Sequence, residues 1–572
     1  MTQGGGFLIQ ELQPGDILTP EDFTDEHRQI GKTAAEFMTN EVMPVAGAIE
    51  AKDFTLMRGL LRKAGDLGLT AVDVPEAYGG LGMDKVSSAI VAERTSQPAS
   101  FSVSFGAHAG IGTLPVVWYG TEAQKRKYLP LLATGEWIGA YALSEASSAS
   151  DAMNCRASAV LGPEGTHYIL NGEKMWITNS GFADLFTVFV KIDGEKFSAF
   201  LVERGTPGLS IGAEEHKMGL RGSSTCPVIL TDCRVPAENL LGEVGKGHHI
   251  AFNILNLGRF KLSAACVGAA RYSLDGAIAY ACERTAFGKP IAGFGLIQEK
   301  LAECAAGIYV GEAMVYRTIG MIDRALADVD AEAAGAAREI QKRIEEYAVE
   351  CSIVKVWGSE MLDRVVDHAV QIHGGYGFVE EYPAERAYRD SRVNRIFEGT
   401  NEINRLIITG WTMKRAASGQ LPLRKAVEEF MGGVLAGGGA PTGPSTAARQ
   451  MALFAAGVAW QKFGPKLSDE QEVMGALADC LMELYAIESC TLRAAKAGAT
   501  RQAVCLAQYY AAGGLAAIES AARKVLAAAA AGDELRTQTA ILRRLARRDA
   551  IDVVALGREI AGHLVRAGRY SL

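Results

Sequence analysis

The chain has 572 residues, of which 48% are hydrophobic and 22% are charged, so its composition excludes a disordered, collagen-like or coiled-coil protein. Its 58 basic and 66 acidic residues give a net charge of −8, which argues against a general nucleic-acid binder, because such proteins need a basic surface. The length predicts about three or four domains.

The N-terminal segment has no Lys or Arg before Arg28, and no apolar run reaches the ~18–20 residues that cross a bilayer. We therefore expect no signal, transit or transmembrane segment, and a cytoplasmic location. The ten cysteines lack paired short spacings, which favours a reducing compartment and predicts no metal centre.

The first region, residues 1–137, is predicted to be helical. Thr24 and Asp25 are typical helix caps and precede a long periodic segment. Leucines recur at helical spacing within residues 55–69, and another helix is expected over residues 121–132.

The pattern changes to β structure over residues 138–245. Asn171-Gly172, between two short apolar runs, is typical of a hairpin turn, so we expect two strands on either side of it. Segments 186–192 and 197–202 are rich in β-branched and aromatic residues, which also favours strands.

Helices are expected again over residues 246–416, including 295–328, 332–373 and 401–416. Residues 431–446, rich in Gly, Pro, Ser and Thr, have the composition of a linker. It lies within a C-terminal helical extension, residues 417–572.

Five motifs follow one another along the chain. They are YALSEASSASD over 141–151, KMWITN over 174–179, RTAFGK and FGLIQEKL over 284–301, QIHGGYGF over 371–378, and IFEGTNEI over 396–403. Their order and spacing resemble those of the acyl-CoA dehydrogenase family over about residues 25–415. The long tail and the motifs FGLIQEKL and IFEGTN most resemble the very-long-chain members.

The resemblance implies a mostly α fold with a central β domain. An N-terminal helical domain (1–137) would precede a β-barrel domain (138–245). A helical bundle with the catalytic Glu (246–416) and the helical extension (417–572) would follow.

Removing two hydrogens from the Cα–Cβ bond of a thioester needs a base for the α-proton and an acceptor for the β-hydride. A side chain cannot accept the hydride, so a flavin is required. By resemblance the cofactor is FAD and Glu398 is the base, while its backbone N–H holds the thioester oxygen. The family's alternative position for the base corresponds to Gly258, which has no acidic group.

The other site residues also rest on the resemblance. On one strand, Trp176 and Thr178 share a face and would lie against the isoalloxazine, and Arg284 would bind the diphosphate of the partner subunit's FAD. The full set expected to contact FAD is Tyr141, Leu143, Ser144, Ser150, Trp176, Thr178, Arg284, Phe287, Phe294, Gln371, Gly374, Gly375, Thr400 and Glu402. The set expected to contact substrate is Ser150, Asn256, Arg259, Phe397 and Gly399.

Two residues near the flavin differ from the family pattern: Ala146 stands in place of Pro, and Ala149 in place of Gly. For three of the site residues a purely structural role stays open at this point. Trp176 could be a core residue, Arg259 a solvated surface residue, and Glu398 an ordinary loop residue.

The resemblance implies α,β-dehydrogenation of acyl-CoA in fatty-acid β-oxidation, with electron-transfer flavoprotein as acceptor. It also implies a homodimer, because members with a C-terminal extension are dimers. Small residues at 99, 102 and 106 would leave room for a long acyl chain, or would simply allow close helix packing. An oxygen-using acyl-CoA oxidase is the alternative activity. The tail could instead serve assembly, as a scaffold, or contact a membrane.

Overall fold

The computed structural model describes all residues except 1–2, 331–335, 436–440, 497 and 499. The chain forms two compact units. The sheet unit comprises Phe23–Ala269 and Leu326–Glu345, and the bundle unit comprises Met1–Asp22, Ala270–Ala325 and Glu346–Leu572. None of the described helices combines the length and the apolar character needed to cross a bilayer.

Short helices make up the first part of the sheet unit. The side chain of Thr24 accepts a hydrogen bond from the backbone N–H of His27 and so caps α1, as the sequence predicts. Thr121 caps α7 in the same way. The helices of eight or more residues in this part are α1 (Asp25–Phe37), α3 (Phe54–Asp66), α4 (Lys85–Arg94), α5 (Ala99–Gly106) and α7 (Glu122–Ala133), with α2 (Ala46–Glu50) and α6 (Leu114–Tyr119) between them.

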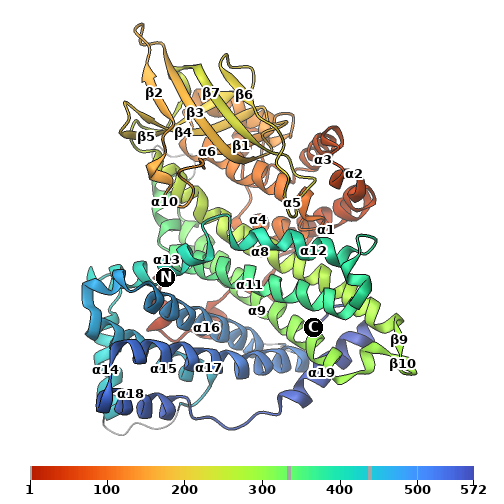
Figure 1. Cartoon of the computed structure of the whole chain (residues 1–572), viewed down its shortest axis with the longest axis vertical. Helices are drawn as coiled ribbons and strands as arrows, with labels where there is room; N and C mark the ends of the chain where they lie inside the picture. Colours follow the sequence, from red (N-terminus) through yellow and green to blue (C-terminus); the bar gives the residue numbers. More distant parts are fainter. Residues whose placement is uncertain (1–2, 331–335, 436–440, 497, 499) are drawn as a thin grey trace. The chain divides into compact units, whose positions relative to one another are not determined.

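A mixed sheet follows the short helices in the sheet unit and lies to one side of them (Figure 1). Its eight strands, all within the described residues 139–241, are β1 (Gly139–Ala142), β2 (Ser158–Leu161), β3 (His167–Thr178), β4 (Leu185–Ile192), β5 (Lys196–Glu203), β6 (Leu209–Ile211), β7 (Thr225–Pro236) and β8 (Leu240–Leu241). The strand order is β6-β7-β3-β2-β4-β5-β8, and β1 pairs with β4. Strands β1 and β2 run parallel to β4, whereas the other pairs are antiparallel.

The hairpin expected at Asn171-Gly172 is wrong, because β3 passes straight through both residues. A Cβ atom at Gly172 would lie 2.6 Å from the Cβ of Ala157, so the glycine allows a close approach of the chain just before β2. The pairing of β3 with β7 shifts register here, and the Asn171 side chain accepts from the backbone N–H of Asp232 at 2.8 Å. The dipeptide therefore marks an irregularity within a strand, not a turn.

The bundle unit holds the long helices. Helix α8 (Gly247–Glu283) continues into it from the sheet unit. The helices that follow are α9 (Gly295–Leu326), α11 (Ala348–His373), α12 (Pro383–Ser391), α13 (Asn401–Ala417), α14 (Leu423–Leu435), α15 (Pro444–Phe463), α16 (Gln471–Ala495), α17 (Arg501–Ala529), α18 (Gly532–Leu545) and α19 (Val553–Ala567). A two-stranded ribbon, β9 (Thr285–Ala286) and β10 (Lys289–Pro290), lies between α8 and α9.

Two predicted boundaries in this part are wrong. Instead of one helix over 332–373, α10 (Ala336–Glu345) and α11 are separate, and the break at Glu346 is where the chain passes from one unit to the other. The Glu346 carboxylate there accepts from the backbone N–H of Gly4 and from Arg415. Residues 331–335 of the expected helix lie outside the described residues.

The expected linker is shorter than 431–446, because α14 extends to Leu435 and α15 begins at Pro444. Proline suits the first turn of a helix, where no backbone donor is needed. Residues 436–440 lie outside the described part of the chain.

Buried ion pairs join the extension to the rest of the bundle unit. Arg317 of α9 donates to Glu488 of α16 at 2.6 Å, and Arg493 of α16 donates to Glu312 of α9 at 2.8 Å. All four side chains are at most 3% exposed. Helices α15, α16 and α17 pack against one another (Figure 1). The expected fold, mostly helical with a central β domain and a C-terminal helical extension, is confirmed.

Candidate active site

Glu398 lies in a short loop between the turn Arg392–Arg395 and α13. Its φ angle is 58°, and that of Gly399 is 79°, so both residues adopt the left-handed region. Glycine reaches this region without strain, but a glutamate does so only when its surroundings hold it there. The backbone at Glu398 is therefore set by specific contacts.

Three polar side chains hold this loop. Lys355 of α11 is fully buried, and its Nζ atom donates to the Gly399 carbonyl at 2.8 Å and to Asn401 Oδ1 at 2.7 Å. The Nδ2 atom of Asn404 donates to the carbonyls of Gly399 and Thr400 at 2.8 and 3.1 Å. The Gly399 carbonyl thus has two side-chain donors, and the Thr400 carbonyl gains one beside the backbone N–H of Asn404.

The start of α13 places two further predicted residues next to this loop. The Thr400 hydroxyl accepts from the backbone N–H of Ile403 and caps the helix. The backbone N–H of Glu402 bonds its own carboxylate, and this bond, with the Thr400 hydroxyl, lowers the pKa of Glu402. Phe397 is half-buried beside Glu398.

A second group of predicted residues lies elsewhere in the bundle unit. The Arg284 guanidinium stacks over the ring of Tyr376 at 5.7 Å, next to Gly374 and Gly375. A Cβ atom at either glycine would meet nothing within 4 Å, so the space beside this backbone is open. Gln371, in the last turn of α11, is exposed as well.

Phe287 is the most exposed large apolar side chain of this group. It is 95% exposed, its φ angle is 52°, and its ring meets that of Phe294 edge-on with 6.1 Å between the ring centres. The ring of Phe287 is therefore open to a ligand or a second molecule.

In the sheet unit, Trp176 lies on β3 at a second register shift against β7, between Lys174 and Ile177. Its φ angle is 59° and its indole is 53% exposed, whereas Ile177 is 2% exposed and Thr178 is half-buried. The alternative of a core tryptophan is excluded by this exposure. The bulge turns the indole out of the sheet.

The loop over residues 141–150 is tied to β3 by a buried ion pair. Lys174 Nζ donates to Glu145 Oε1 at 2.7 Å, and the Ser144 carbonyl accepts from the backbone N–H of Met175 at 2.9 Å. Burial lowers the pKa of Lys174. Burial raises the pKa of Glu145, but Lys174 and two backbone N–H groups outweigh this and lower it overall.

The other predicted residues of this loop differ in burial. Tyr141 is a core side chain whose hydroxyl donates to the Ala251 carbonyl at 3.3 Å, and Leu143 is also buried. Ser144 is half-buried, and Ser150 is exposed. Of these four predicted residues, the two serines are therefore the ones whose side chains are open to a ligand.

Asn256 and Arg259 lie one turn apart on α8, and Arg259 Nη1 donates to Asn256 Oδ1 at 2.8 Å. Both are buried, at 5% and 6% exposed, so the alternative of a solvated Arg259 is wrong. The two residues form one polar pair within the sheet unit.

Each unit by itself offers groups that suit part of a flavin nucleotide. The exposed indole of Trp176 offers a flat apolar surface, Ser144 and Thr178 offer hydroxyl groups, and the open backbone at Gly374-Gly375 beside Arg284 suits a diphosphate. The structure places Glu398, Gly399 and Thr400 in one loop with Glu402 in the helical turn that follows, and it places Ser144 and Trp176 on either side of Lys174.

The residues that sequence reasoning missed are those that position the loops. Lys355, Asn401 and Asn404 form the hydrogen bonds that hold the Glu398 loop. The ion pair of Glu145 with Lys174 ties the loop over residues 141–150 to β3. The sequence did contain a signal for Lys355, which lies inside the apolar run SIVKVWG. A charge buried there is unfavourable without partners, so the lysine predicts polar groups next to it.

Family models match four successive parts of the chain. Their descriptions are acyl-CoA dehydrogenase N-terminal domain (residues 24–136), middle domain (140–233) and C-terminal domain (245–413). A further model, also described as an acyl-CoA dehydrogenase C-terminal domain, matches residues 447–544 in the extension.

Known proteins match over different lengths. A probable acyl-CoA dehydrogenase of Bacillus subtilis is 48% identical over 100% of this chain and 98% of its own length. The human mitochondrial very long-chain specific acyl-CoA dehydrogenase is 42% identical over 71% of this chain, and the match spans 60% of the human protein.

Solved structures agree with these relatives. The crystal structure of an acyl-CoA dehydrogenase complexed with FAD from Bacillus anthracis has a TM-score of 0.98 at 47% identity and covers 100% of both chains. Butyryl-CoA dehydrogenase from Megasphaera elsdenii has a TM-score of 0.61 at 34% identity, over 68% of this chain and 98% of its own. The chain therefore belongs to the acyl-CoA dehydrogenase family, as its motifs predict, and is an enzyme of that family.

Proposed function

We propose that this enzyme converts an acyl-CoA to the trans-2-enoyl-CoA in fatty-acid β-oxidation and passes the electrons to electron-transfer flavoprotein. The observation that carries the proposal is the loop at Glu398, where a carboxylate residue in a left-handed conformation is held by Lys355 and Asn404. Full-length similarity to the Bacillus proteins supports FAD as the cofactor.

In this proposal the Glu398 carboxylate takes the α-proton of the thioester while the Cα–Cβ double bond forms. FAD, when bound, supplies the acceptor for the hydride that leaves Cβ. The backbone N–H of Glu398 donates to the thioester oxygen, and such a donor stabilises the enolate-like charge by roughly 3–4 kcal/mol. Phe397 and Gly399 flank the reacting carbons, and Asn256 with Arg259 binds the CoA portion.

We further propose that the substrate is a long-chain acyl-CoA, of about twelve carbons or more. If the small residues of α5 leave room for the acyl chain, each methylene buried there adds about 0.8 kcal/mol to binding. Ala99 and Ser102 are half-buried and Gly106 is exposed, whereas Ser100 and Ser104 on α5 are buried. The three small residues at 99, 102 and 106 therefore lie on the less buried face of α5. The 42% identity with a very long-chain specific enzyme supports the same length.

The assembly proposed is a homodimer in which Arg284 and Phe287 bind FAD of the partner subunit. The exposure of Phe287 supports this. The cytoplasmic location and the role of the extension in membrane contact or assembly stay predictions.

The test uses the purified, FAD-loaded protein without oxygen. Acyl-CoA substrates from butyryl-CoA to eicosanoyl-CoA are added, and bleaching of the visible flavin band is followed. We expect bleaching by palmitoyl-CoA with formation of the trans-2-enoyl product. Absence of bleaching by every acyl-CoA contradicts the proposed reaction.

Admission of air to the reduced enzyme then separates the two activities. Slow reoxidation in air and fast reoxidation by electron-transfer flavoprotein are expected for a dehydrogenase. Fast reoxidation in air, with formation of hydrogen peroxide, identifies an oxidase instead.

A further inference from the structure

Lys355 is an unusual residue for the centre of a helical bundle. Its side chain is fully buried, and the surrounding α11 residues Val354 and Val356 are buried and apolar. A methionine would fill the same space without the cost of burying an ammonium group. The lysine therefore provides something other than packing.

What it provides is two hydrogen bonds to the Glu398 loop. Its Nζ atom reaches the carbonyl of Gly399, the residue after Glu398, and the side-chain oxygen of Asn401. Both acceptors lie within three residues of a glutamate with a φ angle of 58°. The ammonium group thus fixes the backbone on the C-terminal side of the carboxylate.

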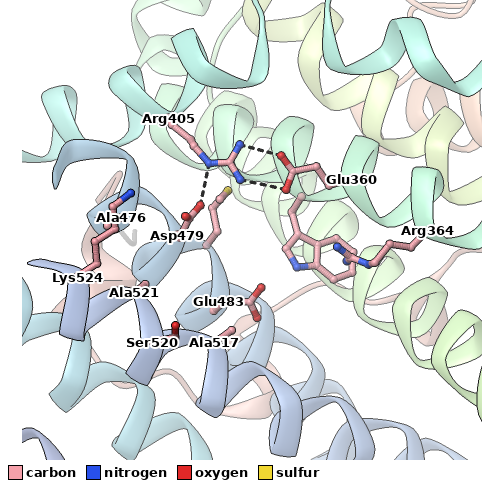
Figure 2. Close-up of a pocket in the computed structure, with 12 residues that line it drawn as sticks. Glu360, Arg364, Arg405, Ala476, Asp479, Glu483, Ala517, Ser520, Ala521 and Lys524 are labelled. Atoms are coloured by element: carbon pink, nitrogen blue, oxygen red, sulfur yellow. Dashed lines mark hydrogen bonds and ion pairs between the residues drawn. The ribbon is translucent and has the colours of Figure 1, made fainter. Parts of the chain in front are cut away.

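The hydrogen bonds continue from this loop into the extension. Asn401 Nδ2 donates to Glu360 Oε1 at 3.0 Å. Arg405 of α13 donates to both oxygens of Glu360, at 2.7 and 3.0 Å, and its Nε atom donates to Asp479 of α16 at 2.8 Å. Figure 2 shows Arg405 between Glu360 and Asp479 at the wall of a cavity of about 430 Å³.

We propose that Lys355 is a positioning residue for Glu398, and that Asp479 of the extension steadies the same network through Arg405, Glu360 and Asn401. The inference rests on the proposed role of Glu398 as the base. It adds a role for the extension: helix α16 helps to order the catalytic loop.

The first test compares Lys355→Met with Lys414→Met, which removes an exposed lysine from α13. We expect Lys355→Met to lower the rate of flavin reduction at saturating palmitoyl-CoA about 10- to 100-fold, the effect of a misplaced catalytic group. The half-saturating concentration should change little, and Lys414→Met should behave as the wild type.

A second readout does not depend on turnover. Hydrogen–deuterium exchange of the peptide covering residues 396–404 should become faster in Lys355→Met than in the wild type or Lys414→Met. Lys355→Gln keeps one donor and should recover part of both the rate and the protection. Lys355→Gln replaces Lys355→Met in the test if the methionine variant does not bind FAD or unfolds at a markedly lower temperature than the wild type.

Wild-type rate and wild-type exchange in a folded Lys355→Met variant overturn the inference. Glu398→Gln, measured in parallel, separates this result from a failure of the proposed function. If Glu398→Gln reduces the flavin normally, the base is misassigned; if it does not while Lys355→Met does, only the positioning role is wrong.

The last test addresses the extension. Asp479→Asn should lower the flavin-reduction rate about twofold or more, and the exposed Glu472→Gln on the same helix should not. In the Lys355→Met background, Asp479→Asn should have no further effect. An equal loss in both backgrounds contradicts the coupling of α16 to Lys355.

Discussion

Three of the residues assigned to the site from sequence have a backbone conformation that their side chains disfavour. Trp176, Phe287 and Glu398 all have φ angles between 52° and 59°. Such a conformation costs of order 1–3 kcal/mol at each residue and persists only where surrounding contacts enforce it. At Glu398 those contacts come from Lys355 and Asn404, so stability elsewhere in the bundle unit maintains a strained loop.

The substitution Glu398→Gln tests the role of the carboxylate itself. It keeps the size and the hydrogen-bonding groups but removes the proton acceptor, so flavin reduction by acyl-CoA should fall at least about 100-fold. FAD content and acyl-CoA binding should be retained, as measured by absorbance and by titration. Glu381→Gln, an exposed control on the same unit, should reduce at the normal rate. Near-normal reduction by Glu398→Gln would refute the assignment.

Between neighbouring elements, buried charges rather than apolar contacts alone fix the geometry. In the sheet unit, Asp73 lies in the loop before α4 and accepts from Lys85 of α4 and Lys261 of α8, at 2.5 and 2.6 Å. Burial raises the pKa of Asp73, but the two ammonium groups outweigh this and hold the pKa well below its usual value of 3.8. The carboxylate thereby joins α4 to α8.

Replacing Asp73 by Asn should lower the free energy of unfolding by up to about 3–5 kcal/mol near neutral pH, because two largely covered lysines, 12% and 15% exposed, lose their counter-charge. A lowered folded-state pKa contributes stability above the unfolded-state pKa of 3.8, and that contribution is lost as the pH falls. The difference between variant and wild type should therefore shrink below about pH 4. Calorimetry at several pH values measures it.

The exposed pair Lys196–Asp193 supplies the control for this experiment. Asp193→Asn should change the stability by less than about 1 kcal/mol, as expected for a surface ion pair. A small effect of Asp73→Asn at neutral pH would show that the buried carboxylate does not hold α4 to α8.

Helix α5 carries the prediction about chain length. Ser102→Leu fills space on its small-residue face, and each methylene that the substrate can no longer bury should lower kcat/KM about fourfold. We expect palmitoyl-CoA to lose more than octanoyl-CoA, with FAD content unchanged. Ser210→Leu, on the exposed side of β6, is the control. Equal losses for all chain lengths, or a wild-type preference for butyryl-CoA, would argue against this face as part of the acyl site.

For the molecule as a whole, three highly exposed apolar residues of the bundle unit support the proposed assembly. Phe287, Leu296 and Phe378 are 95%, 75% and 85% exposed. A homodimer is therefore expected in analytical ultracentrifugation of the FAD-loaded protein. A tetramer at protein concentrations well above any dissociation constant, or a monomer, would contradict the proposed assembly.

The sequence alone was sufficient for the family, the fold class and the order of helical and sheet regions. Ordered motifs and helix caps such as Thr24 and Thr121 depend on residues close together in the chain, and such local signals can be followed without coordinates. Glu398 was proposed as the base in the same way, because the motif around it resembles that of the family.

Only the tertiary structure decided the features that depend on distant residues. It changed Asn171-Gly172 from a turn to a strand irregularity, because a close approach to Ala157 and a bond to Asp232 compete with the local turn preference. It also brought Lys355 to a loop more than forty residues away and joined that loop to α16. Local propensity cannot encode such contacts, since their free energy arises only when the helices pack and exclude water from the charges between them.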